Sequence, residues 1–192
     1  MSEAEFLTWN EEGLKAEFVD GNVIIFPPCT VIHDEYVGGL SSLIGLFASK
    51  HHLGVVLATR GIALRLRKGL VRSPDVIFLR NSRRDIIRET YLDGAPDLAI
   101  EFVSPESIVR DWHEKYREYE AAGIREYWIV DQLQERLEVY RLGRDRRFHS
   151  ITLKEGKLYS RVLSGFWVKP EWFWASSDFD YYEMAKEIGI IA

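Results

Sequence analysis

Hydrophobic and polar residues follow two different periods in the first third of the chain. The segment "KAEFVDGNVIIF" (15–26) predicts two strands around Asp20-Gly21, because both residues tolerate the positive φ of a tight hairpin turn. A short helix is expected before this hairpin. Between Thr30 and His52 the spacing becomes helical and stops at Gly54, which predicts an amphipathic helix. Its apolar positions are Val37, Leu40, Ile44 and Phe47.

Strand patterns alternate with helical ones over the rest of the chain. The stretches "VVLAT", "IALRLR" and "DVIFL" predict strands, with a turn at Lys68-Gly69, and a polar, partly helical segment leads to another apolar strand at 98–103. A helix is expected from Ser107 to Ala122, ended by Gly123. The strands "EYWIVD" and "LEVYRL" and a hairpin-like stretch over 148–163 follow, and the aromatic tail "GFWVKPEWFW" is typical of a core cover or a dimer surface. The predicted class is α/β of the mixed α+β kind, with a central mixed sheet flanked by helices and additional β-hairpins.

Length and composition restrict the class of protein. A chain of 192 residues fits one domain, here expected over residues 1–192. Cys29 is the single cysteine, which excludes an intrachain disulfide and a thiolate zinc cluster and suits a reducing cytosol. The N-terminus is acidic, and no apolar run approaches the ~20 residues of a membrane span. We therefore expect a cytoplasmic protein that does not bind a membrane.

Charge is unevenly distributed along this acidic chain, whose net charge is -5. Between Arg60 and Arg88 nine bases stand against two acids, which leaves this basic tract at +7. Such a tract could hold a phosphate backbone, or it could simply be solvated strand edges and a polar helix. The two interpretations are equally supported by the sequence.

An acid lies inside an apolar strand. Glu101 stands in "PDLAIEFVSPES" (96–107), and burying an ionised carboxylate costs several kcal/mol unless a partner compensates it. A second acid, Asp75, follows Pro74 at the start of "DVIFL", where proline is tolerated because the strand has barely begun. Both positions require a chemical reason.

A lysine falls on the buried side of the following helix. At 100° per residue from Ile108, Lys115 lies at about -20°, within the stripe of Trp112, Tyr116 and Tyr119. Solvent-facing charges occupy the opposite side: Arg110, Glu114, Arg117 and Glu118. Two carboxylates and one ammonium at a sheet edge suit Mg²⁺ and phosphate chemistry, since Mg²⁺ prefers oxygen ligands. An equally supported alternative is that Asp75 caps a turn while Glu101 and Lys115 form a structural ion pair.

These motifs resemble the Uma-two family of restriction endonuclease-like proteins, a branch of the PD-(D/E)XK nuclease superfamily. The resemblance rests on "SPDVIFL", "PDLAIEFVSPES" and "RDWHEKYREYEAAGIREYWIVD". It extends to "AEFVDGNVI", to Pro27, Pro28 and His33, and to "SGFW" near the C-terminus, so that it covers most of the chain.

The resemblance implies a site and a reaction. Asp75 and Glu101 would be metal ligands, joined by the main-chain carbonyl of Phe102, and the metal would be Mg²⁺ or Mn²⁺. Val103 stands where the superfamily places its lysine, and Lys115 from the next helix would replace it. Glu17 and His33 also match the family, as supporting ligands or, as the residues alone slightly favour, an exposed hairpin glutamate and a helix-start histidine. Tyr119 could hydrogen-bond near the site, although a core tyrosine is favoured.

The leading hypothesis is therefore a Mg²⁺-dependent endonuclease that hydrolyses DNA phosphodiester bonds. The alternative is a catalytically inactive protein of the nuclease fold that serves as a nucleic-acid or protein interaction module. A homodimer is expected, because cutting both strands of DNA usually needs two sites. The sequence contains no G-x-S-x-G elbow or Walker-type loop, its histidines show no zinc spacing, and Cys29 is interpreted as an inert thiol.

Overall fold

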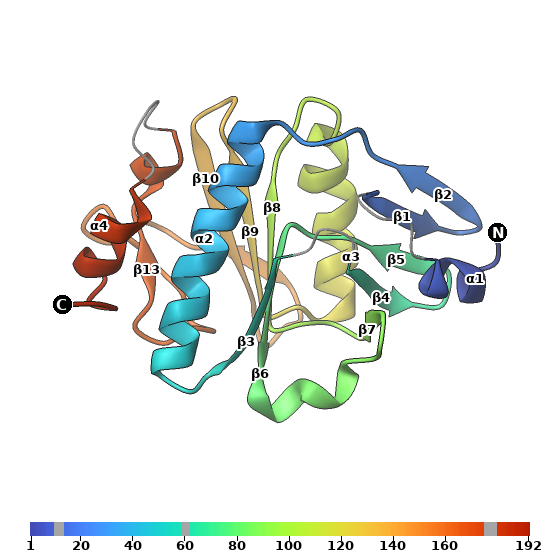
Figure 1. Cartoon of the computed structure of the whole chain (residues 1–192), viewed down its shortest axis with the longest axis horizontal. Coiled ribbons are helices and arrows are strands. Elements are labelled where there is room, and N and C mark those ends of the chain that lie inside the picture. The colour runs from blue at the N-terminus through green and yellow to red at the C-terminus, as the bar shows by residue number, and fades with distance from the viewer. Residues whose placement is uncertain (10–13, 59–61, 175–179) are drawn as a thin grey trace.

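A six-stranded mixed sheet forms the centre of the protein (Figure 1). The computed structural model describes residues 1–9, 14–58, 62–174 and 180–192. The strand order of the sheet is β11-β10-β9-β8-β6-β3, and only β8 and β9 run parallel. Its strands are β3 (Gly54–Ala58), β6 (Val76–Arg80), β8 (Leu98–Phe102), β9 (Glu126–Asp131), β10 (Arg136–Leu142) and β11 (Phe148–Ser150). The predicted mixed sheet is thus confirmed.

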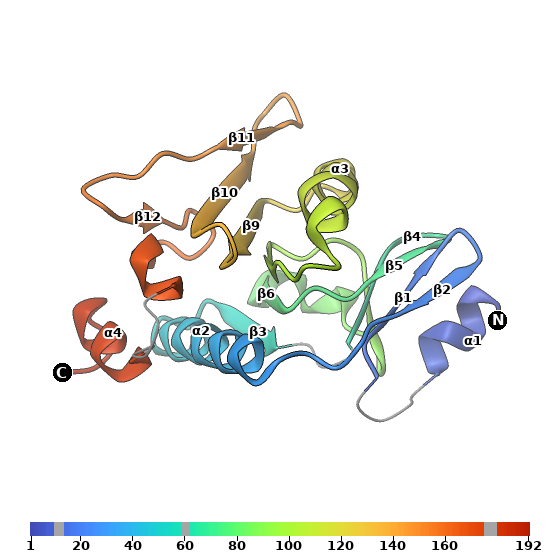
Figure 2. The ribbon, with the colours of Figure 1, turned by 90° about the horizontal axis from the view of Figure 1, so that it is seen from above.

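Helices cover both faces of this sheet, as Figure 2 shows from above. On one face lies α2 (Val31–Lys50), whose N-cap Thr30 accepts a hydrogen bond from the backbone N–H of His33. On the other face lie the π turn η2 (Arg110–Glu114) and α3 (Lys115–Ala122), which ends at Gly123 with a φ of 87°. Strand alternation assigns the side chains to these two layers. Val76, Phe78, Leu98 and Ile100 belong to the core under α2, whereas Ile77, Ala99, Tyr127 and Ile129 belong to the core under α3. Glu101 therefore faces α3.

A second sheet, of five strands, packs beside α3 in the order β2-β1-β5-β4-β7. Its strands are β1 (Ala16–Val19), β2 (Asn22–Ile25), β4 (Ala63–Arg67), β5 (Leu70–Arg72) and β7 (Tyr91–Asp93). The helix α1 (Glu3–Thr8) covers it through Phe6, whose ring centroid lies 5.6 Å from that of Phe18. The predicted hairpin and N-terminal helix are confirmed, but β5, the strand that joins the hairpin to β4, was not predicted.

The C-terminal segments close the core on the α2 side. They are β12 (Leu158–Tyr159), β13 (Trp167–Val168), the 3₁₀ helix η3 (Pro170–Phe173) and α4 (Tyr181–Glu187). Phe166 and Phe173 are fully buried in the core under α2, which confirms the aromatic tail as a core cover. The hairpin-like interpretation of 148–163 holds only for its turn, where Lys154 and Lys157 form an isolated antiparallel bridge, because β11 pairs with β10 and β12 pairs with β13.

The polar segment after β6 forms the 3₁₀ helix η1 (Asn81–Ile86) at the end of β6 opposite Asp75. Among the described residues, no helix combines the length and apolarity needed to cross a membrane.

Candidate active site

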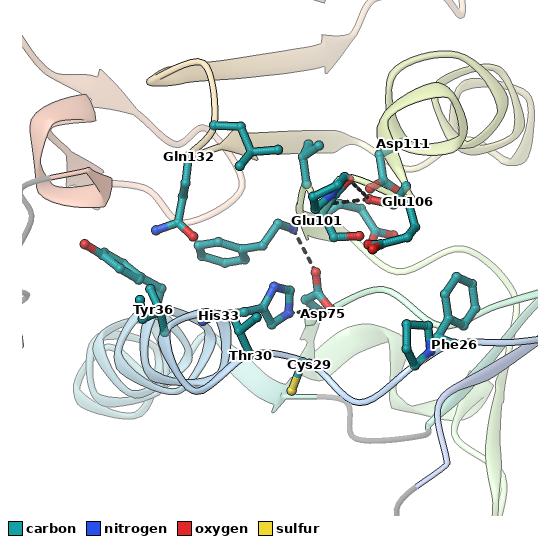
Figure 3. Close-up of a pocket in the computed structure, with 18 of the residues that line it drawn as sticks. Phe26, Cys29, Thr30, His33, Tyr36, Asp75, Glu101, Glu106, Asp111 and Gln132 are labelled. Atoms are coloured by element: carbon teal, nitrogen blue, oxygen red, sulfur yellow. Dashed lines mark hydrogen bonds and ion pairs between the residues drawn. The ribbon is translucent and has the colours of Figure 1, made fainter.

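Glu101 lies in β8, and Asp75 directly precedes the neighbouring strand β6. The antiparallel register of β6 and β8 sets Val76 opposite Ile100, so the two acids occupy adjacent positions at the same end of the sheet. The carboxylate of Asp75 reaches the next strand directly, since its Oδ2 accepts a 2.8 Å hydrogen bond from the backbone N–H of Phe102. Asp75 is 4% exposed and Glu101 1%, and both line one pocket of about 770 Å³ (Figure 3). The prediction of neighbouring strands that open on a common cleft is confirmed.

Lys115 is the partner of Glu101. Its Nζ lies 2.9 Å from Oε2 of Glu101, 3.0 Å from Oδ1 of Asp111 and 3.3 Å from Oε1 of Glu17. The second oxygen of Glu101 accepts a 2.6 Å hydrogen bond from the hydroxyl of Tyr119. Lys115 is only 2% exposed, so the sequence expectation that it faces inward is confirmed. An ammonium has three protons to donate, and three carboxylates surround this one.

Burial and the neighbouring charges together raise the pKa of both members of this pair. Burial raises the pKa of Glu101 to about 8; Lys115 opposes this shift, whereas Asp111 and Asp75 reinforce it. Burial also works against the charge of Lys115, but Asp111, Glu101 and Glu17 together hold its pKa well above the usual value. At neutral pH the lysine is therefore charged, and a bound cation would lower the pKa of Glu101 again by favouring its carboxylate form.

Asp75 is held ionised by a cation that the sequence analysis did not identify. Nζ of Lys15 lies 2.6 Å from Oδ1 of Asp75, and Nε2 of His33 lies 3.5 Å from the same oxygen. Burial raises the pKa of Asp75, but Lys15 and His33 outweigh it and hold the pKa well below its ordinary range. His33 thus begins α2 and also faces the site. Tyr119 likewise combines both interpretations, because it is a core residue that hydrogen-bonds to Glu101.

The interpretation of Glu17 as an exposed hairpin glutamate was wrong, because Glu17 is 0% exposed. Arg72 donates a 2.7 Å hydrogen bond to its Oε2, and the backbone N–H of Ser73 donates to its Oε1. The same arginine donates to Glu118 of α3 through both Nε and a terminal nitrogen. The added strand β5 carries Arg72, and this arginine ties β1 to α3 and brings Glu17 to Lys115.

The helical wheel failed at the beginning of the helix for a local reason. The backbone of η2 is a π turn, which has more residues per turn than an α-helix. The buried positions up to Asp111 are therefore one residue earlier in the sequence than the helical wheel predicts. Ile108 is 37% exposed, whereas Ser107 and Asp111 are buried. The buried series is therefore Ser107, Asp111, Lys115 and Tyr119, with a spacing of four. Asp111 was missed, although an acid four residues before a lysine is a signal of helix pairing.

Arg72 contacts the site from behind through Glu17, but the rest of the basic tract does not approach it. Arg60 lies outside the described residues, and none of the described bases of the tract lines the pocket. Most of them pair elsewhere: Arg65 with Glu3 and Asp93, Arg67 with Asp20, Arg80 and Arg83 with Asp97, and Arg88 with Asp93. Arg72 is buried. Of the two interpretations of the tract, the structure therefore does not support a phosphate-holding surface in this cleft, because its described bases lie outside the pocket and β6 carries the chain from Asp75 to η1.

The donor chemistry at the pocket fits a hard divalent cation. Four carboxylates (Glu17, Asp75, Glu101, Asp111) face three cations (Lys15, Arg72, Lys115), and Oδ1 of Asp111 is buried without a well-oriented hydrogen bond among the described residues. Within the described chain no three His, Cys, Asp or Glu groups form a ready metal cage. Mg²⁺ does not require one, since it commonly takes one or two carboxylates and keeps several waters. Phe102, whose carbonyl is the third ligand implied by the resemblance, lines the same pocket.

Comparison with known proteins identifies the family. The Uma2 family, described as "Putative restriction endonuclease", matches residues 3–171. The chain belongs to the Uma2 family. The match includes every site residue discussed above, from Lys15 to Tyr119.

A solved structure shares the fold of this Uma2 protein. It is described as a "putative nuclease belonging to DUF820" from Anabaena variabilis ATCC 29413, and it matches with a TM-score of 0.73 over 89% of this chain and 96% of that one. At 17% identity this likeness concerns the fold alone. No curated protein matches the sequence. The family description agrees with the nuclease class expected from the motifs.

Proposed function

We propose that this Uma2 protein is a Mg²⁺- or Mn²⁺-dependent endonuclease that hydrolyses DNA phosphodiester bonds. The observation that carries the proposal is the meeting of Asp75 and Glu101 from adjacent strands with Lys115 in one pocket. The family description supports the reaction class, and the donor chemistry supports the choice of a hard cation.

Each residue of the pocket would have a separate role in the proposed hydrolysis. Asp75, Glu101 and the carbonyl of Phe102 would hold the metal, which would polarise the phosphate and lower the pKa of a bound water. With Glu101 engaged in this way, Lys115 would have a proton free to orient the attacking water. The oxygen of that water bonds to phosphorus, one P–O ester bond breaks, and the leaving oxygen takes up a proton. Lys115 would also offset the negative charge that develops during attack.

Plasmid nicking tests the proposal directly. The wild type should convert supercoiled DNA to open-circular DNA with Mg²⁺ or Mn²⁺ and not with EDTA. Asp75→Asn, Glu101→Gln and Lys115→Met should each lower the rate by ~10²-fold or more. Asp85→Asn is the matched control, because this exposed acid lies in η1 and should leave the rate unchanged. A wild type that never nicks DNA with either metal would contradict the assignment.

The contacts of Lys115 favour one rival, a nuclease-fold interaction module without catalysis. The ammonium of Lys115 is surrounded by three carboxylates, and a purely structural ion cluster would have the same contacts. Lys115→Met should lower the free energy of unfolding by about 3 kcal/mol or more in either case. Removing both partners in Lys115→Met/Glu101→Gln should recover part of that stability. A wild type that binds DNA but never cuts it, together with this recovery, would support the rival.

A further inference from the structure

Phe26, in the segment between β2 and α2, gathers two cations at the mouth of the pocket. The guanidinium carbon of Arg110 lies 4.4 Å from the centroid of its ring, and Nζ of Lys15 lies 5.8 Å from the same centroid. All three residues line the pocket that contains Asp75 and Glu101. Figure 3 shows Phe26 across the pocket from Tyr36 and Gln132. An aromatic face attracts a cation and restricts where a flexible side chain can lie.

The guanidinium of Arg110 has N–H donors that no described residue accepts from. Within the described chain no carboxylate forms an ion pair with it, and its Nε is buried without a hydrogen-bond partner. Its one hydrogen bond, from a terminal nitrogen to the carbonyl of Glu106, is long at 3.5 Å. A guanidinium offers five donors in a planar fork that matches a phosphate.

Few other cations are available to a phosphate in this pocket. Of the described lysines and arginines, only Lys15, Arg110 and the buried Lys115 line it, while six acids also do: Glu35, Asp75, Glu101, Glu106, Asp111 and Glu135. A phosphate that enters is therefore repelled over much of the wall and attracted mainly around Phe26. The basic tract cannot supply this contact, since its described bases lie outside the pocket.

We infer that Arg110 and Lys15, gathered around the ring of Phe26, form a subsite for a backbone phosphate of the nucleic acid. The inference rests on the proposed function for the identity of the ligand. Arg110 would hold the phosphate through its fork, with Phe26 keeping the guanidinium in place. Lys15 would add its charge when a metal has taken its position on Asp75.

The test measures binding without cleavage. A fluorescently labelled DNA duplex is titrated with the protein in EDTA, and again in Ca²⁺, at several NaCl concentrations. Arg110→Gln should weaken binding about tenfold at low salt. It should also reduce the salt slope by about one, because one phosphate contact is lost. Arg110→Lys should keep the slope but bind more weakly, and Phe26→Ala should cost about threefold in affinity by freeing the guanidinium.

Arg84→Gln is the matched control, because Arg84 is exposed in η1, forms no described ion pair and lies away from the pocket. Its affinity and slope should equal those of the wild type. Thermal unfolding of Arg110→Gln checks that the π turn is intact. The subsite is refuted if Arg110→Gln binds like the wild type, if Arg84→Gln loses as much slope, or if no DNA binds. Arg110-dependent binding without Mg²⁺-dependent cleavage would retain the subsite and contradict the nuclease assignment.

Discussion

At the scale of single residues, the site is a set of buried carboxylates in which Asp75 and Glu101 pair with different lysines. Asp75 pairs with Lys15 and remains ionised, whereas Glu101 pairs with Lys115 and is pushed toward its neutral form. The difference follows from the surroundings, since burial, Asp111 and Asp75 raise the pKa of Glu101 more than Lys115 lowers it. Two carboxyl groups with separated pKa values are typical of functional sites.

Stability should depend on pH through Glu101. Its pKa is raised from 4.5 to about 8, so between these values the folded state holds a proton that the unfolded state has released. The stabilisation is complete below pH 4.5 and is lost as the pH rises through 8. Urea unfolding in EDTA should show the free energy of unfolding falling by up to about 1.4 kcal/mol per pH unit relative to Glu101→Gln. Parallel pH profiles for the two proteins would contradict the raised pKa.

Lys15 should compete with a metal for Asp75. Nζ of Lys15 lies 2.6 Å from Oδ1 of Asp75. Because the lysine side chain is 28% exposed, it can move into solvent when a divalent cation binds. Lys15→Met removes the competitor, and Mg²⁺ or Mn²⁺ should then bind about tenfold more tightly by calorimetry. In EDTA the variant should be less stable than the wild type, because Asp75 has lost its cation, and the metal should restore more stability to it than to the wild type.

Lys68→Met is the control for this measurement, because Lys68 lies in the turn between β4 and β5 outside the pocket. The double variant Lys15→Met/Asp75→Asn should lose the added metal response. Equal metal affinity in Lys15→Met and the wild type would show that Lys15 has only a structural role.

At the scale of elements, the sequence predicted what depends on local pattern. The strands that carry Asp75 and Glu101, the helix that carries Lys115 and the N-terminal hairpin all follow from alternation, helical period and turn residues. The other half of the site depends on packing between distant segments. Arg72 pairs with Glu17, 55 positions away, and with Glu118, 46 positions away, and no local period encodes such contacts. Asp111 was missed because a π turn interrupts the helical period.

The basic tract shows that residues close in the sequence can also lie far apart in the fold. Charges that cluster along the sequence separate in space when the chain is extended, because five strand residues span about 16 Å. Asp75 therefore lies at the pocket, while Arg80, at the other end of β6, pairs with Asp97. Net charge per segment left open whether the tract forms an interaction surface, and the strand direction separates most of its charges from the pocket.

Arg72 should hold the five-stranded sheet against α3. It is 1% exposed and pairs with Glu17 of β1 and with Glu114 and Glu118 at α3. Arg72→Met leaves the buried Glu17 without one of its two cationic partners, so the free energy of unfolding should fall by about 3–5 kcal/mol. Nicking should also fall, although Asp75 and Glu101 are unchanged, because β1 positions both Lys15 and Glu17.

Arg67→Met is the matched control within the same sheet. Its partner Asp20 is 66% exposed and Arg67 itself 58%, and exposed pairs contribute little. Its stability should stay within about 0.5 kcal/mol of the wild type in urea unfolding. If both arginine variants lose the same stability, then the buried cluster does not tie β1 to α3.

At the scale of the whole molecule, one chain presents one pocket with both proposed metal ligands. The described residues place Asp75, Glu101 and Lys115 together once, at a single end of the sheet. One such site cuts one strand, and a cut in both strands requires either two chains or two successive encounters. The number of chains acting together is therefore visible in the products of cleavage.

Mixing active and inactive chains should reveal the homodimer expected for a double-strand cut. In a dimer, a chain with Glu101→Gln paired with a wild-type chain keeps one working site, so open-circular plasmid should accumulate while linear plasmid falls with the square of the active fraction. If separate monomers cut in succession, adding the inactive chain should slow both steps only through competition for DNA. Sedimentation of the free protein provides the second measurement. A monomer in solution whose linear product falls in proportion to the active fraction would contradict the dimer.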